Sequence, residues 1–188
     1  MPEIFVFGGC NGSGKTTFAN NFLNTAPNIE YVNADTIAAQ LNPSNVEAVA
    51  IQASRMMLER LNTLAVSKID FAFKTSLAAR SFAKFLRECK NRGYQVNLVD
   101  VWLSSVELAI DRVAARVASG GHNIPEATII KRYNRGRQNF IELYVPIADR
   151  WRIYDNSEVK IEPIAYCLNS RQAPTILQSN TWNKIINY

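Results

Sequence analysis

Cysteine, histidine and long apolar runs are scarce in this sequence of 188 residues. Its three cysteines, Cys10, Cys89 and Cys167, stand far apart, and His122 is its one histidine. Three scattered thiols predict neither a disulfide framework nor a zinc site, and they fit a reducing cytoplasm. No apolar run is long enough to span a bilayer, and no basic segment precedes an apolar one at the N-terminus. We therefore expect a cytoplasmic protein that makes no membrane contact.

The overall composition is that of an ordinary globular protein. Apolar residues make up 47% of the chain and charged residues 20%, and no repeat or linker-like stretch interrupts it. We expect a single domain over residues 1–188. The net charge of +5 indicates either a nucleic-acid surface or a site for phosphates, and the positions of the basic residues must distinguish the two.

Short apolar strands alternate with helical patterns along the chain, which predicts an α/β fold with a parallel sheet. We expect strands at residues 1–7, 31–33, 69–74, 95–103 and 161–168. We expect helices at 15–23, 46–66, 80–91, from Ser104 or Ser105 to 118, at 125–138 and at 140–151, with a short helix in the tail.

The stretch GGCNGSGKTTFA follows the first strand, opens a helix and fits the G-x-x-x-x-G-K-[ST] pattern of a phosphate-binding loop. Glycines let main-chain N–H groups point at phosphates, Lys15 reaches the β and γ phosphates, and the Thr16 hydroxyl is placed to ligate Mg²⁺. The predicted ligands are ATP and Mg²⁺. Cys10 lies near Lys15 and a helix N-terminus, an environment that lowers a thiol pKa. The predicted nucleotide-binding residues are Gly9, Asn11, Gly12, Ser13, Gly14, Lys15, Thr16 and Thr17.

Such a loop occurs in kinases, ATPases, GTPases and ABC subunits alike. The sequence contains no N-K-x-D guanine signature, no L-S-G-G-Q-like segment and no clear D-E pair after its third or fourth strand. A compact kinase is the class that remains.

Five further segments occur in a fixed order: VNADTIA (32–38), FAFKTSLAAR (71–80), VWLSSVELAIDRVAARVASGGHNIP (101–125), IIKRYNRGRQNFIELYVP (129–146) and WRIYDNS (151–157). With the loop, they resemble the zeta-toxin-like P-loop proteins, in particular the bacterial branch of predicted ABC-type ATPases or kinases of unknown substrate. The resemblance implies a three-layer, adenylate-kinase-like fold with a five-stranded parallel sheet of order 2-3-1-4-5 and a helical lid over about residues 105–138. It also implies transfer of the ATP γ-phosphate to a hydroxyl of a small molecule, as zeta toxins do with a nucleotide sugar, and an antitoxin partner.

Asp35 matches the acid that the family places after its second strand, the proposed general base. Ligands of open α/β sheets bind at the carboxyl ends of strands, where Asp35 is expected to lie beside Lys15. Its other interpretation is an N-cap for a helix from Thr36, because Asp is a preferred cap.

Basic residues cluster on the two helices predicted between 105 and 138. Arg112 and Arg116 are four residues apart, share a helix face and resemble the arginines with which this family clamps phosphates. Arg132 is expected to join them in neutralising the transferring phosphoryl group. The alternatives are a solvated basic face and nucleic-acid binding, which no stacking-aromatic pattern supports. His122 is either a substrate contact or part of a local loop hydrogen bond.

Lys74 is the one departure from the family pattern, which usually has F-E-T-T-L where this chain has F-K-T-S-L. Three hypotheses follow: an anionic acceptor pairs with Lys74; Lys74 pairs with Asp35 and leaves a nucleotide-binding pseudokinase that signals through a protein partner; or the change is incidental. Thr75 still matches the hydroxyl residue that follows. The predicted substrate-binding residues are thus Asp35, Lys74, Thr75 and His122. A nucleic-acid-associated ATPase is the remaining hypothesis, favoured only by the basic helices.

Overall fold

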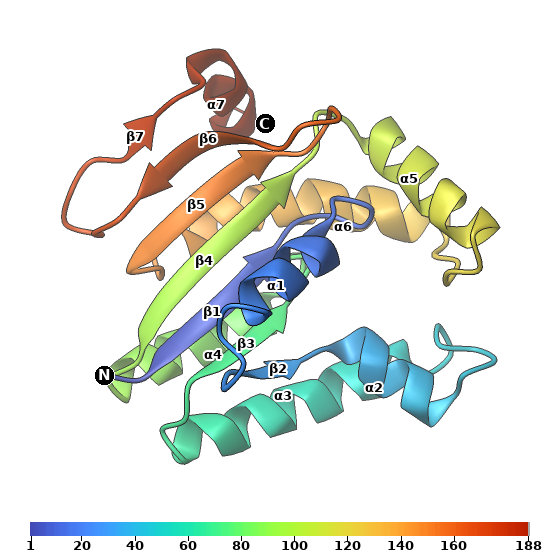
Figure 1. The fold of residues 1–188 in the computed structure, drawn as a ribbon, viewed down its shortest axis with the longest axis horizontal. Helices are drawn as coiled ribbons and strands as arrows, with labels where there is room; N and C mark the ends of the chain where they lie inside the picture. The colour runs from blue at the N-terminus through green and yellow to red at the C-terminus, as the bar shows by residue number, and fades with distance from the viewer. Residues whose placement is uncertain (188) are drawn as a thin grey trace.

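The computed structural model describes residues 1–187, whose strands form one seven-stranded sheet of order β2-β3-β1-β4-β5-β6-β7 (Figure 1). The first five strands are parallel, whereas β6 and β7 extend the sheet in antiparallel fashion. The strands are β1 (Glu3–Gly8), β2 (Glu30–Val32), β3 (Phe71–Lys74), β4 (Gln95–Trp102), β5 (Arg150–Asp155), β6 (Glu162–Cys167) and β7 (Thr175–Ile176). The predicted order 2-3-1-4-5 is confirmed, and the predicted strand count of five is too low by two.

Helices cover both faces of this sheet (Figure 1). Successive side chains of β1 point to opposite faces and therefore pack against different helices. Ile4 and Val6 are buried against α3, α4 and the π-helical turn η1, whereas Phe7 is buried against α1 on the other face. Among residues 1–187, no helix combines the length and the apolar composition needed to cross a bilayer. The helices are α1 (Lys15–Leu23), α2 (Ala34–Leu41), α3 (Ala50–Val66), α4 (Arg80–Asn91), α5 (Val106–Ala118), α6 (Glu126–Asn139), η1 (Phe140–Tyr144) and α7 (Ser179–Ile186).

The fifth strand departs most from the elements predicted from the sequence. The predicted helix at 140–151 stops after the π-helical turn at Tyr144, and the following residues form β5, with Trp151 and Ile153 buried. Buried and exposed side chains alternate along β5, as they do in a strand. The helical pattern that immediately precedes β5 made this short alternation hard to recognise in the sequence. The segment predicted as the last parallel strand is instead β6, which pairs antiparallel with β5. The predicted helix at 46–66 begins only at Ala50.

Candidate active site

The phosphate-binding loop connects β1 to α1 in a conformation that needs glycine. Gly14 is the N-cap of α1 with φ +92°, and a Cβ there would lie 2.7 Å from Asn156 Nδ2. Gly9 has φ +134°, and a Cβ there would clash with the Val101 carbonyl oxygen. A side chain at either position is excluded both by the left-handed backbone and by close neighbours. The loop therefore has the tight main-chain turn expected of a phosphate cradle.

A turn after β5 supports the loop from behind. Asn156 Nδ2 donates to the Ser13 carbonyl oxygen at 2.8 Å. Asp155 Oδ1 accepts from the Ser157 N–H at 2.8 Å, and Ser157 Oγ accepts from the Ser104 N–H at 2.8 Å, so the turn is held at both ends. In the sequence, Asn156 stood out only as part of the WRIYDNS segment of the family resemblance and of a turn-like Asp-Asn-Ser composition, and its support of the loop was not predicted.

Lys15 is directed at the loop itself. Its ammonium donates to the Cys10 carbonyl oxygen. Burial lowers the pKa of Lys15 to about 8, and repulsion from Lys74 acts in the same direction. Burial also raises the pKa of the Cys10 thiol to about 11, although Lys15 opposes that rise. The expectation of a lowered thiol pKa at Cys10 is therefore wrong, because burial outweighs the nearby cation.

Asp35 is not the cap of its helix. The Asn33 side chain accepts from the Asp35 N–H at 2.9 Å, so Asn33 is the N-cap and α2 begins at Ala34. The cap interpretation of Asp35 is wrong, and its carboxylate faces the ligand cavity from the first turn of α2. Partial desolvation at the cavity wall would by itself raise the pKa of Asp35, but attraction to Lys74 and a hydrogen bond from it lower the pKa below its ordinary value.

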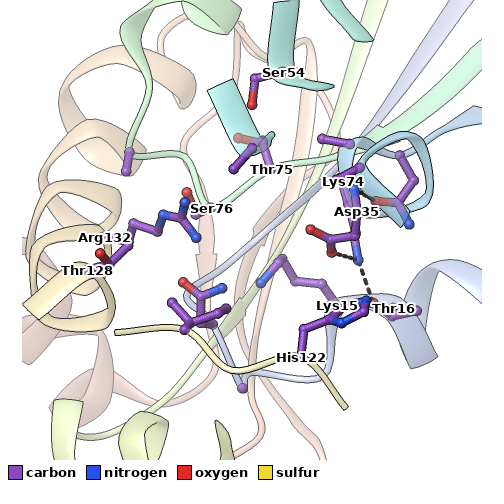
Figure 2. Close-up of a pocket in the computed structure, with 18 of the residues that line it drawn as sticks. Lys15, Thr16, Asp35, Ser54, Lys74, Thr75, Ser76, His122, Thr128 and Arg132 are labelled. Atoms are coloured by element: carbon purple, nitrogen blue, oxygen red, sulfur yellow. Dashed lines mark hydrogen bonds and ion pairs between the residues drawn. The ribbon is translucent and has the colours of Figure 1, made fainter. Parts of the chain in front are cut away.

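Lys74 connects Asp35 to the phosphate-binding loop (Figure 2). Its Nζ lies 2.7 Å from Asp35 Oδ2 and donates to Thr16 Oγ1 at 3.0 Å. The Lys74 side chain is 13% exposed, whereas that of Asp35 is 69% exposed. One ammonium thus bridges the carboxylate expected to contact the acceptor and the hydroxyl expected to bind a metal.

These groups open into a cavity of about 880 Å³ with a strongly cationic lining. Arg132 projects from α6 on the side of the cavity opposite Lys15 and Lys74 (Figure 2). The excess of positive charge suits a polyanionic ligand. Seven basic side chains and two carboxylates line the cavity: Lys15, Lys74, Arg112, Arg116, Lys131, Arg132 and Arg135, with Asp35 and Glu47.

Two of the predicted clamp residues are engaged with main-chain carbonyls while they line the cavity. Arg112 Nη2 donates to the Ser157 carbonyl at 3.1 Å, and Arg116 Nη2 donates to the His122 carbonyl at 3.0 Å. The loop of His122 between α5 and α6 is thus tied to α5 through its backbone. His122 itself is exposed at the cavity wall, so the structure brings it to the site together with both arginines.

The helix that carries Arg132 is anchored against the loop that follows β3. A Cβ on Gly136 would lie 2.5 Å from the Ser76 carbonyl oxygen, so the two backbones approach closely. Asn139 Nδ2 donates to the Leu77 carbonyl at 2.8 Å. The Thr75 hydroxyl accepts from the Leu77 N–H at 3.1 Å in the same loop, which also lines the cavity. The helix that carries Arg132 and the loop that carries Thr75 are therefore packed directly against each other.

The Mg²⁺ ion that this fold implies does not fit the residues as they are arranged. Mg²⁺ binds oxygen at about 2.1 Å, and an ion on Thr16 Oγ1 would meet the Lys74 ammonium on the same oxygen. The carboxylate of Asp35 is also paired with that ammonium. Within residues 1–187, no group of three or more His, Cys, Asp or Glu side chains is arranged to hold a metal ion.

Asp100 is a buried carboxylate that the sequence analysis did not identify. It lies in β4 behind the phosphate-binding loop, and its Oδ1 has no hydrogen-bond partner among the described residues. Burial raises its pKa from 3.8 to about 7, while attraction to Lys15 opposes the rise. The only signal in the sequence was one acid within the apolar run of β4.

Comparisons with known proteins agree with this architecture. The family model described as zeta toxin matches residues 1–163. A protein of Haemophilus influenzae that is named only as uncharacterised is 34% identical over 131 residues, which is 70% of this chain and 92% of the relative.

Two solved structures share the fold at low sequence identity. The complex of AvrRxo1-ORF1 and -ORF2 with ATP superposes with a TM-score of 0.78 at 17% identity, over 98% of this chain and 63% of that one. This chain thus spans less than two thirds of that protein. The PezAT toxin-antitoxin system of Streptococcus pneumoniae superposes with a TM-score of 0.61 at 18% identity, over 100% of this chain and 84% of that one.

Proposed function

Because this chain belongs to the zeta toxin family, we propose that it is an ATP-dependent phosphotransferase that moves the γ-phosphate to a hydroxyl of a small molecule. One observation carries the proposal. Lys15 of the phosphate-binding loop, the carboxylate of Asp35 and the guanidinium of Arg132 line the same cavity of about 880 Å³ from three different elements.

In the proposed reaction the loop N–H groups and Lys15 hold the phosphates of ATP. The acceptor oxygen bonds to the γ-phosphorus as the bond from that phosphorus to the ADP oxygen breaks, and the hydroxyl proton leaves through Asp35. Charge develops on the transferring group and the leaving oxygen, where Arg112, Arg116 and Arg132 neutralise it.

Asp35 acts chiefly by orienting the acceptor. The Lys74 ammonium lowers the pKa of this carboxylate, which keeps it ionised but makes it a weak base. An ionised carboxylate still accepts a hydrogen bond from the hydroxyl and points its oxygen at the γ-phosphate. Phosphoryl transfer tolerates such a weak base because its transition state is loose, with little bond formation to the nucleophile.

The acceptor that we propose is an anionic molecule with free hydroxyl groups, such as a nucleotide sugar. Three hydroxyl side chains also line the cavity, Ser54, Thr75 and Ser76, and they suit a polyhydroxylated ring (Figure 2). Met57 and Phe82 add apolar surface to the lining. The cationic lining provides for phosphates on the acceptor as well as on ATP.

A pseudokinase is the second candidate, and the 2.7 Å pair between Lys74 and Asp35 favours it. If the carboxylate paired with Lys74 does not also accept a hydrogen bond from the acceptor hydroxyl, no transfer takes place. The chain would then bind a nucleotide and act through a protein partner. A partner of the antitoxin kind is part of this proposal, since PezAT is described as a toxin-antitoxin system.

The test is transfer of label from γ-labelled ATP to a panel of nucleotide sugars and other hydroxyl metabolites, with and without Mg²⁺. A labelled product from the natural chain that is lost in Lys15→Ala and in Asp35→Asn establishes the kinase. ATP binding without any product, together with product formation by Lys74→Glu, establishes the pseudokinase instead. Absence of ATP binding under all conditions rules out both.

A further inference from the structure

We infer that the Lys74 ammonium takes the place of the divalent cation at this nucleotide site, so that the chain binds a nucleoside triphosphate free of metal. The inference deepens the proposed function and rests on it, because it takes the cavity to hold the phosphates of a nucleotide. It concerns the form of the nucleotide that is recognised, whichever acceptor the chain uses.

The position of the ammonium is the first argument. Lys74 Nζ lies 3.0 Å from Thr16 Oγ1, the hydroxyl that follows the loop lysine, and 2.7 Å from Asp35 Oδ2. A hydroxyl and a carboxylate are the kinds of oxygen that Mg²⁺ prefers. An ammonium has three N–H donors. Two are directed at these oxygens, and the third remains for an oxygen of the phosphate chain.

The ammonium is held in place by the sheet. Lys74 is the last residue of β3, where it pairs with Phe7 of β1 in parallel register, and the Thr75 N–H donates to the Phe7 carbonyl at 2.9 Å. Its side chain is 13% exposed. Since β1 leads directly into the phosphate-binding loop, the register of these two strands sets the distance from the ammonium to the loop.

The charges around the cavity are the second argument. A triphosphate without Mg²⁺ keeps its full negative charge, and seven basic side chains against two carboxylates line the space that would receive it. Mg²⁺ on Thr16 would add two positive charges directly beside Lys74 and near Lys15, whose pKa Lys74 already lowers by repulsion. Binding of the ion would therefore require Lys74 to move away from both of its partners.

The experiment compares ATP binding in excess EDTA and in saturating Mg²⁺ by calorimetry. For the natural chain we expect the two dissociation constants to agree within about threefold, which corresponds to less than about 1 kcal/mol of binding free energy. For Lys74→Met we expect ATP affinity in EDTA to fall by about tenfold or more, and Mg²⁺ to restore part of it. Lys160→Met is the matched control, because Lys160 is 85% exposed and lies outside the cavity. It should behave like the natural chain.

Each result decides the question. Binding by the natural chain that needs Mg²⁺ overturns the inference and leaves the proposed nucleotide site intact. Equal loss of affinity in Lys74→Met and Lys160→Met also overturns it, since a general charge effect would then explain the result. Absence of ATP binding in both buffers overturns the proposed function together with the inference. The comparison on the natural chain needs no variant, so misfolding of Lys74→Met does not spoil the test.

Discussion

Lys74 Nζ lies 2.7 Å from Asp35 Oδ2, and this contact joins the carboxyl end of β3 to the first turn of α2. The two residues are 39 positions apart in the sequence. The pair places a cation where the family resemblance leads to the expectation of an acid, and Lys74 also contacts Thr16 of the phosphate-binding loop. The pair changes the charge that a ligand meets in the cavity, and this effect is distinct from its effect on folding stability.

The Lys74–Asp35 pair should contribute little to folding stability. Asp35 is 69% exposed, and exposed ion pairs contribute about 0.2–1 kcal/mol. We expect Lys74→Met to change the free energy of unfolding in urea by less than about 1 kcal/mol.

Lys90→Met is the matched comparison, because Lys90 donates to both Asp149 Oδ1 and the Ile147 carbonyl in a part-buried setting. That variant should cost more, about 1.5–3 kcal/mol. Equal costs for the two variants would mean that the Lys74–Asp35 pair has a structural role after all.

ATP affinity should fall in alkaline solution because of Lys15. Burial lowers its pKa to about 8, so the free protein loses most of this charge above that pH, while bound phosphates favour the charged form. Binding then takes up a proton, and the affinity should decrease by up to about tenfold for each pH unit above 8. Calorimetric titrations from pH 6.5 to 9.5 measure this.

Lys15→Arg provides the control for that profile, since a guanidinium stays charged over the whole range. Its affinity should be lower but should not decline above pH 8. A parallel decline in both proteins would assign the effect to another group.

Asp100 should make the chain less stable at neutral pH than in mild acid. Its pKa is raised from 3.8 to about 7, so between these values the folded chain holds a proton that the unfolded chain has released. The stability contributed by this group is present at low pH and is lost as the pH rises through 7. Above that pH the folded state carries a buried, ionised carboxylate whose Oδ1 has no hydrogen-bond partner within residues 1–187.

Asp100→Asn should remove this slope and raise the free energy of unfolding at pH 8 by about 1–3 kcal/mol. The measurement is the difference between the two proteins in urea unfolding at pH 5.5 and pH 8, which cancels the groups that they share. A difference that does not change with pH would show that Asp100 is ionised throughout.

Asn156 should matter for nucleotide binding through the loop that it supports. Its Nδ2 donates to the Ser13 carbonyl, and truncation to alanine removes a hydrogen bond of about 1 kcal/mol, equivalent to roughly fivefold in ATP affinity. We expect Asn156→Ala to lose about that factor. Asn134→Ala, an exposed position on α6 outside the cavity lining, should lose none. An unchanged affinity in Asn156→Ala would mean that the glycines alone hold the loop.

Local patterns were sufficient for the parts of the fold that depend on neighbouring residues. The glycine loop, the helices at 15–23 and 80–91 and a serine cap at 104 or 105 all follow from short-range geometry, and the structure has them, with Ser105 as the cap of α5. The prediction from periodicity was wrong after Tyr144, where a helical pattern continues into residues that form β5. Pairing of Trp151 with β4 is what makes this segment a strand. The prediction of the final strands was wrong for the same reason, because contacts between distant residues decide whether a strand runs parallel or antiparallel to its neighbour.

The sequence by itself determined which chemical groups meet at this site, because the loop motif and the ends of parallel strands carry Lys15, Asp35, Lys74 and Thr75 to one edge of the sheet. Only the tertiary structure decided what those groups do to one another. Of the three hypotheses for Lys74, the one that pairs it with Asp35 predicted a contact, and the structure has that contact at 2.7 Å together with one to Thr16 at 3.0 Å. The raised pKa of Asp100 likewise follows only from its burial in the folded chain. Ion pairing and desolvation depend on distances of a few ångströms between elements far apart in the chain, and packing alone sets those distances.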